Sequence, residues 1–143
     1  MRHGFTVLEI ITVMAIIGLL ASLGLLMGTE LYRGYSFSSE VTTVVTLLER
    51  ARSGSVNGYE QGVFVSGNSY VLYHGSSWQN HDAAQDISFS KNPSILISDS
   101  NDIHFLLGSG SPDRASKIVM HSNTQTAQIV IASQGVISVN PIP

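Results

Sequence analysis

The feature that most constrains this chain is an uncharged apolar run close to its N-terminus. No residue from Ile10 to Met27 is charged, and almost all of them are apolar. With Phe5 to Leu8 before it, the run is long enough for a helix that crosses a hydrocarbon core, which needs roughly 20 residues. Glu9 lies within this apolar stretch, and an unpaired carboxylate near the bilayer centre costs at least about 2.5 kcal/mol. The sequence therefore predicts a membrane helix whose Glu9 needs a positive partner.

Cleavage of the chain between Gly4 and Phe5 would create such a partner. It would leave a positive α-amino group on Phe5, four residues before Glu9 and on the same helical face. The residues Gly4-Phe5-Thr6-Val7-Leu8-Glu9 resemble the class III signal of type IV pilins and of the pseudopilins of type II secretion. In that family a prepilin peptidase cuts after the glycine and methylates the new N-terminal phenylalanine. The resemblance implies the same processing here, and N-methylphenylalanine would retain the charge.

Two other interpretations of the N-terminus compete with this one. A secretory signal peptide would account for Arg2 and for the small residues Ala21 and Ser22. However, the apolar run is longer than the apolar region of such a signal and carries an acid near its start. An ordinary N-terminal anchor would account for the length of the run but would leave Glu9 unexplained.

Beyond Met27 the sequence predicts that the helix continues and becomes amphipathic. Together the two halves would form a helix of about 50 residues, or about 75 Å. Stop signals follow at Ser53-Gly54 and at Asn57-Gly58. The apolar stripe has spacings of three and four residues and consists of Phe37, Val41, Val44, Val45, Leu48 and Ala51, whereas Glu40, Thr42, Thr43, Glu49 and Arg50 fall on other faces.

From Gly58 the pattern changes to the short apolar runs that are typical of strands. Segments 62–65 and 69–73 flank Ser66-Gly67-Asn68 and predict a hairpin. Trp78 is expected in a polar loop, 108–113 in another loop, and Pro141 and Pro143 are expected to stop further pairing. Further strands are expected at 86–89, 94–97, 102–107, 117–121, 127–132 and 135–139.

The sequence thus predicts an α+β fold, in which a long N-terminal helix packs on an antiparallel β-sheet domain. Four segments are expected along the chain. They are a leader peptide at 1–4, the transmembrane half of the helix at 5–28, its amphipathic half at 29–57 and a C-terminal β domain at 58–143.

The second half of the chain extends the resemblance. The motifs Glu49-Arg50-Ala51-Arg52-Ser53, Trp78, Ile103-His104-Phe105 with Gly108, and Ile129-Val130-Ile131 with Gly135-Val136-Ile137 look like the H-type pseudopilin and the related T-type minor pilin. The resemblance implies a structural subunit of a type IV pilus or of a type II secretion pseudopilus. Its implied partners are other pilins or pseudopilins, a prepilin peptidase, and an inner-membrane assembly platform with a cytoplasmic ATPase.

The positive-inside rule, applied to Arg2, places the N-terminus in the cytoplasm and the β domain outside the inner membrane. In the assembled filament, Glu9 would meet the Phe5 amine of a neighbouring subunit and fix the register between the two helices. An alternative function is a binding module at the filament tip that recognises secreted substrate or DNA. The formal net charge of −3 argues against nucleic acid as a partner.

Gly18, Gly24 and Gly28 have more than one interpretation. Gly24 and Gly28 form a small-xxx-small pair that would let another membrane helix approach closely. Glycine also costs roughly 1 kcal/mol relative to alanine in an ordinary helix, so the three residues could favour local melting of the helix. Simple tolerance of glycine in a membrane helix is the third interpretation.

The sequence contains no constellation that predicts catalysis. There is no cysteine, which excludes a disulfide framework. His74, His81, His104 and His121 are scattered, without the convergent ligands of a zinc site. The segment Asp99-Ser100-Asn101-Asp102 is rich in oxygen ligands but lacks the glycine and distal glutamate of an EF-hand loop, and a turn accounts for it. We expect no enzyme activity, no metal and no cofactor.

Overall fold

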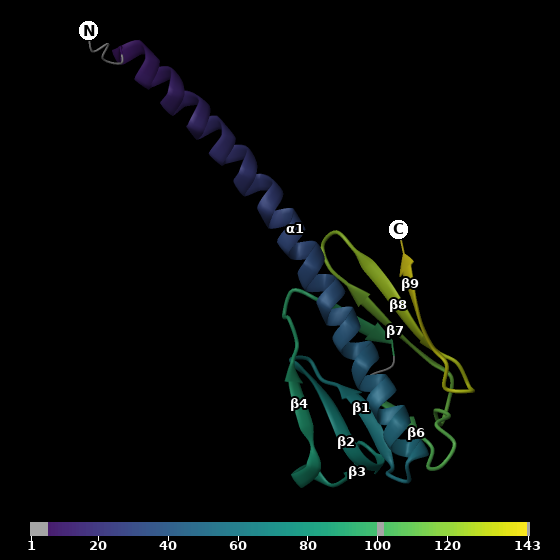
Figure 1. The fold of residues 1–143 in the computed structure, drawn as a ribbon. Helices are drawn as coiled ribbons and strands as arrows, with labels where there is room; N and C mark the ends of the chain where they lie inside the picture. The colour runs from purple at the N-terminus through teal and green to yellow at the C-terminus, as the bar shows by residue number, and fades with distance from the viewer. Residues whose placement is uncertain (1–5, 100–101, 143) are drawn as a thin grey trace. The chain divides into compact units, whose positions relative to one another are not determined.

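The computed structural model describes residues 6–99 and 102–142, apart from the side chains of residues 26, 27 and 30. One long helix, α1 (Val7–Val56), precedes a short 3₁₀ helix and two antiparallel sheets (Figure 1). The expected α+β class is therefore confirmed. The chain divides into two compact units, Met1–Ser36 and Phe37–Pro143, and each is described by itself.

The C-terminus of α1 is fixed by the second of the two predicted stop signals. Gly58 has a φ of +92°, a left-handed conformation that glycine adopts without steric cost. Its N–H donates to the Ser55 carbonyl at 3.3 Å, and the Tyr59 N–H donates to the Gly54 carbonyl at 3.0 Å. These two bonds form a Schellman motif, which satisfies carbonyls left over at the helix end.

The first predicted stop signal, Ser53-Gly54, does not end the helix, because α1 continues through it to Val56. Gly54 is instead required by packing. A Cβ atom at this position would overlap the side-chain amide of Gln61, which lies on the first strand. The glycine therefore allows close contact between the helix and the sheet rather than termination.

The β region forms two sheets, and every strand pair is antiparallel. The first sheet has the order β3-β2-β1-β6, with β4 also paired to β2, and the second has the order β5-β7-β8-β9. The predicted hairpin at 62–73 is confirmed as β1 and β2, with Val65 opposite Tyr70. The elements are β1 Gln61–Val65, β2 Ser69–Ser77, β3 Asn80–His81, η1 Ala83–Gln85, β4 Ile87–Ser90, β5 Leu96–Asp99, β6 Asp102–Phe105, β7 Ser116–His121, β8 Thr126–Ile131 and β9 Ile137–Ile142.

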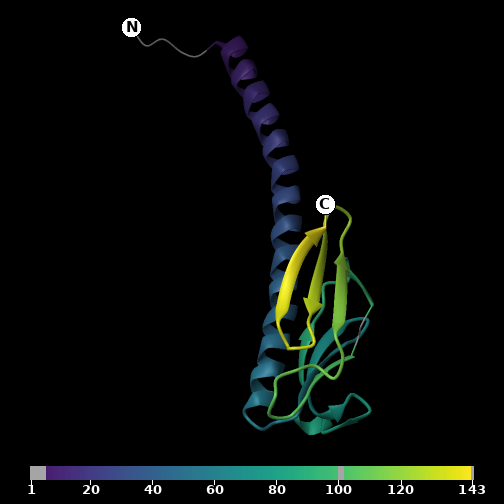
Figure 2. The same cartoon turned by 90° about the vertical axis from the view of Figure 1, so that its right-hand side faces the viewer.

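A single core joins the helix residues of the second unit to both sheets. Both ribbon views show this part of α1 lying along the strands (Figure 2). The predicted stripe is buried at Phe37, Val44, Leu48 and Ala51, with Val41 and Val45 partly buried, and Leu47 is also buried, although the stripe did not include it. The sheets contribute Val63, Val65, Tyr70, Leu72, Ile95, Ile103, Phe105, Ile118, Met120, Ala127, Ile129 and Ile131.

One expectation about the β region is wrong. Pro141 does not stop pairing, because β9 continues to Ile142 and Pro141 lies opposite Ala127 on β8. β9 is an edge strand, where a missing N–H is tolerated. The expectation that Trp78 lies in a loop is confirmed, because it lies in the turn between β2 and β3. Its ring also stacks on Phe64 at a centroid distance of 4.1 Å.

Candidate functional site

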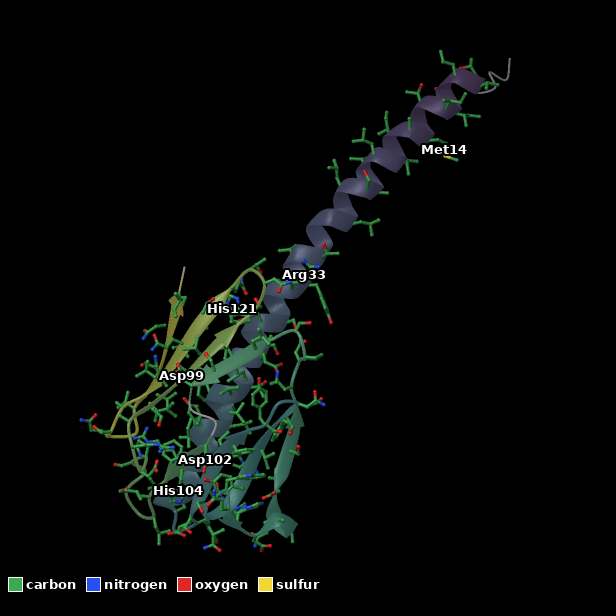
Figure 3. The ribbon with its side chains drawn as sticks, turned by 180° about the vertical axis from the view of Figure 1, so that it is seen from behind. Met14, Arg33, Asp99, Asp102, His104 and His121 are labelled. Carbon is green, nitrogen blue, oxygen red and sulfur yellow. The ribbon has the colours of Figure 1, made fainter. Side chains whose placement is uncertain are left out.

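The N-terminal part of α1 is the strongest candidate for a functional element. Residues Val7–Leu25 form a helix of 19 residues that is long and apolar enough to cross a membrane, and none of this stretch is buried. Figure 3 shows side chains, Met14 among them, projecting all around this part of the helix. Exposing so many leucine, isoleucine and valine side chains to water is unfavourable, so this part of the helix needs an apolar environment. A membrane or a bundle of similar helices would provide one.

Thr6 caps the N-terminus of α1. Its hydroxyl oxygen accepts a hydrogen bond from the Glu9 backbone N–H at 3.3 Å, and its carbonyl accepts one from the Ile10 N–H at 3.2 Å. Thr6 and Glu9 thus have the spacing of a capping box, in which the acid also favours the positive end of the helix dipole. This Thr-x-x-Glu signal was not among the predictions from the sequence, and it gives Glu9 a second role, in stabilising the N-terminus of the helix.

Three polar residues lie within Val7–Leu25, and the side chains of only two of them form hydrogen bonds within the helix. The Thr12 hydroxyl donates to the Leu8 carbonyl at 2.8 Å, and the Ser22 hydroxyl donates to the Leu19 carbonyl at 2.8 Å. Such bonds make hydroxyl groups compatible with hydrocarbon. The Glu9 carboxylate takes part in no hydrogen bond or ion pair among the described residues. Its requirement for a counter-charge is therefore not met within the described part of the chain.

The predicted processing residues, Gly4 and Phe5, lie outside the described residues. Thr6 and Val7, which follow them, are described, and the helix begins at Val7. The predicted ion pair between Glu9 and the Phe5 amine therefore stays a prediction.

Gly18, Gly24 and Gly28 lie within the continuous helix α1. A Cβ atom at any of the three would meet no other atom within 4 Å, so nothing in the described chain requires glycine there. Gly24 and Gly28 line a shallow groove on the helix with Leu25, Thr29, Tyr32 and Arg33.

The β domain offers no metal centre in the described part of the chain, where no three potential ligands converge. Asp99 forms an ion pair with Lys117 at 3.4 Å, and Asp102 accepts a hydrogen bond from the Tyr73 hydroxyl at 2.8 Å. Figure 3 shows Asp102 and His104 close together on β6. Burial raises the pKa of Tyr73, and the bond to Asp102 raises the pKa further. The carboxylates of Asp99 and Asp102 therefore bind other side chains of the protein.

The four histidines lie on strands of the two sheets, and one of them is buried. His104 is buried, with an exposed fraction of 8%, and its Nε2 has no partner among the described residues. His74 lies 2.6 Å from the Gln61 side chain, and His121 lies 2.7 Å from the Thr126 hydroxyl. His81 forms an ion pair with Asp86 at 3.1 Å.

Glu40 is a further residue whose role the helical pattern did not predict. One of its carboxylate oxygens accepts hydrogen bonds from the Tyr70 hydroxyl at 3.0 Å and from the Asn92 backbone N–H at 2.8 Å. Burial raises the pKa of the Tyr70 hydroxyl, and the neighbouring Glu40 carboxylate raises it further. Glu40 therefore connects α1 to β2 and to the segment that leads into β5.

Comparison of the chain with protein-family models, with curated proteins and with solved structures finds no match.

Proposed function

We propose that this chain is a structural subunit, a minor pilin or pseudopilin, of a type IV pilus or a type II secretion pseudopilus. The observation that carries the proposal is that one of the three polar side chains in Val7–Leu25 has no hydrogen-bond or ion-pair partner in the described chain. Thr12 and Ser22 are satisfied by carbonyls of their own helix, whereas the Glu9 carboxylate has no partner in the described chain. An acid in that position is costly in a bilayer unless a cation reaches it.

Processing would supply this cation. A prepilin peptidase would cut between Gly4 and Phe5 and methylate the new amine, which would keep its positive charge. When the apolar helix then leaves the bilayer for a bundle of similar helices, Glu9 would bind the Phe5 amine of a neighbouring subunit. A buried charge is tolerated when it is paired in this way. Only one axial stagger joins acid to amine, so the pair would also set the register.

The remaining parts of the proposal follow from this role. The N-terminus would face the cytoplasm, and the β domain would lie outside the inner membrane until assembly transfers the subunit to the filament. The partners would be other pilins or pseudopilins, the peptidase, and an assembly platform driven by a cytoplasmic ATPase.

The first test is the mature N-terminus. Mass spectrometry of the protein extracted from membranes should find Phe5 as the first residue, with one added methyl group. An N-terminus at Met1 would contradict processing, and one beyond Ala21 would indicate a secretory signal peptide instead.

The second test separates the two roles of Glu9. Glu9→Gln keeps the residue spacing of a capping box, because glutamine is used at that position as well as glutamate, but it removes the charge. Glu9→Val removes both. If the charge matters, both variants should be cleaved and should insert, yet neither should enter filaments. The expected loss is on the order of 3 to 5 kcal/mol, or at least about a hundredfold in an assembly equilibrium.

Thr12→Val is the matched control. It removes a polar side chain from the same segment, but one whose hydroxyl is already bonded to its own helix, so assembly should be retained. The measurement is the fraction of processed protein in sheared or cross-linked filaments. If Glu9→Gln assembles like the wild type, the capping role suffices and the pairing proposal is wrong.

A further inference from the structure

Three large side chains project from one face of α1 just beyond the apolar run. Leu31, Tyr32 and Tyr35 are 62%, 76% and 75% exposed. Tyr35 is three residues from Tyr32 and four from Leu31, so it lies next to both on the helix surface. All three belong to the first unit, Met1–Ser36, and together they are called the tyrosine face below.

The tyrosine face begins where the part of the helix that fits into hydrocarbon ends. The apolar run ends at Met27, and Glu30 is the next charged residue. From Val7 to Met27 the helix is about 30 Å long, which is the thickness of a hydrocarbon core. Tyr32 lies about 8 Å beyond Met27 along the helix axis, and Tyr35 about 12 Å beyond it. The headgroup region on each side of a bilayer is about 5 to 8 Å thick, so Tyr32 is at its level.

The direction of the side chains brings the rings closer to the bilayer. In an α-helix the Cα–Cβ bonds tilt toward the N-terminus, and a side chain covers the turn that precedes its own Cα. Tyr32 follows this rule, because it lines the shallow groove formed by Gly24, Leu25 and Gly28. The same tilt directs Tyr35 back toward the headgroup level.

The chemistry of tyrosine suits this boundary better than it suits a protein contact. The hydroxyls of Tyr70 and Tyr73 are bonded to carboxylates, whereas those of Tyr32 and Tyr35 form no hydrogen bond in the described chain. A neighbouring apolar helix would cover rings and hydroxyls alike, and a buried hydroxyl without a partner is costly. Phospholipid covers the rings and leaves the hydroxyls among water and polar headgroups, the level at which tyrosine is enriched in membrane proteins.

We propose that the tyrosine face packs into the lipid headgroup layer on the side of the membrane opposite the N-terminus, so that phospholipid is its partner before assembly. This rests on the membrane helix of the proposed function and adds its depth. Met27 lies at the hydrocarbon boundary, and the two tyrosine rings lie among the headgroups and hold the helix at that level.

The absence of cysteine from the chain allows the depth to be measured at single positions. Leu31→Cys is labelled with a nitroxide, and the full chain is reconstituted in phosphatidylcholine vesicles at a high ratio of lipid to protein, which keeps the helices apart. Electron paramagnetic resonance then compares collisions of the nitroxide with oxygen, which concentrates in hydrocarbon, and with a water-soluble nickel chelate. Leu19→Cys, in the apolar run, should favour oxygen, and Ser53→Cys, exposed in the second unit, should favour nickel. Leu31→Cys should give an intermediate ratio.

A double substitution tests whether the tyrosines hold this position. Tyr32→Ser with Tyr35→Ser keeps two hydroxyls but removes both rings, so the ratio at Leu31→Cys should move toward that of Ser53→Cys. Ser38→Ala with Ser39→Ala changes two other exposed residues of the helix and should leave the ratio unchanged.

The possible failures are distinguishable. The headgroup contact is refuted if Leu31→Cys matches either Leu19→Cys or Ser53→Cys. It is also refuted if the tyrosine substitutions leave the ratio unchanged, or if the serine substitutions change it equally. In each of these cases the membrane helix stands as long as Leu19→Cys favours oxygen. If Leu19→Cys favours nickel instead, the membrane helix of the proposed function is refuted as well.

Discussion

Replacing Glu40 by alanine should destabilise the β domain, although Glu40 lies outside the apolar stripe of the helix. Its carboxylate accepts two hydrogen bonds, from the Tyr70 hydroxyl at 3.0 Å and from the Asn92 N–H at 2.8 Å. Tyr70 is fully buried, with an exposed fraction of 0%. Its hydroxyl would then have neither the carboxylate nor free access to water.

The magnitude follows from the cost of leaving donors unsatisfied. A buried donor that loses its acceptor costs about 1 to 3 kcal/mol. The Asn92 N–H adds less, because this residue is only half-buried and water can replace the acceptor. We expect Glu40→Ala to lower the free energy of unfolding by about 2 to 4 kcal/mol. Tyr70→Phe removes the donor together with its bond and should cost less, about 1.5 kcal/mol.

The assay is urea unfolding of a soluble fragment of residues 29–143, followed by circular dichroism. Glu49→Ala is the matched control, because Glu49 is an exposed glutamate on the same helix and should change stability by no more than about 0.5 kcal/mol. In a double-mutant cycle, Glu40 and Tyr70 should show a coupling of about 0.5 to 3 kcal/mol.

The role assigned to Glu40 would be refuted if Glu40→Ala were no more destabilising than Glu49→Ala. It would also fail if the cycle gave no coupling, since the two side chains would then act independently.

Three further outcomes are expected. Leu48→Ala should lower the free energy of unfolding by about 2 to 5 kcal/mol, because Leu48 is fully buried in the core; a loss below about 0.5 kcal/mol in urea unfolding would place it on the wrong face. Gly62→Ala should cost about 1 to 3 kcal/mol in the same assay, because its Cβ would overlap the Tyr73 ring and lie 2.8 Å from a backbone oxygen, whereas Gly67→Ala meets nothing within 4 Å and should be nearly neutral. Burial and hydrogen bonds to carboxylates raise the pKa of Tyr70 and Tyr73, so the fold should lose stability above about pH 10, where the unfolded chain releases these protons. In an alkaline titration followed by absorbance, two of the five tyrosines should ionise only on unfolding, and ionisation of all five before the loss of circular dichroism would contradict this.

Local signals in the sequence predicted the main elements well. The apolar run, the amphipathic stripe and the signal Asn57-Gly58 predicted the helix and its C-terminus, because a helix and its caps depend on residues within a few positions of one another. The turn at 66–68 predicted the first hairpin for the same reason. Thr6 and Glu9 form a local signal too, and the sequence alone was sufficient to find it.

The partners of the polar side chains depended on tertiary structure. Glu40 is 30 residues from Tyr70 and 52 residues from Asn92 along the chain, and no local period relates such positions. Gly54 has the sequence signature of a helix end, but its contact with Gln61 gives it a packing role instead.

The apolar helix and the ring stack of the β region show the same division. The sequence alone determined that a helix long and apolar enough to span a membrane carries one acid near its start, because both properties depend only on the order of residues. Tertiary structure decided that Trp78 stacks between Phe64 and His81 and that His81 faces two acceptors. Ring stacking and ion pairing need atoms within a few ångströms of one another, and only the folding of β1, β2 and the segment before β4 brings these groups that close.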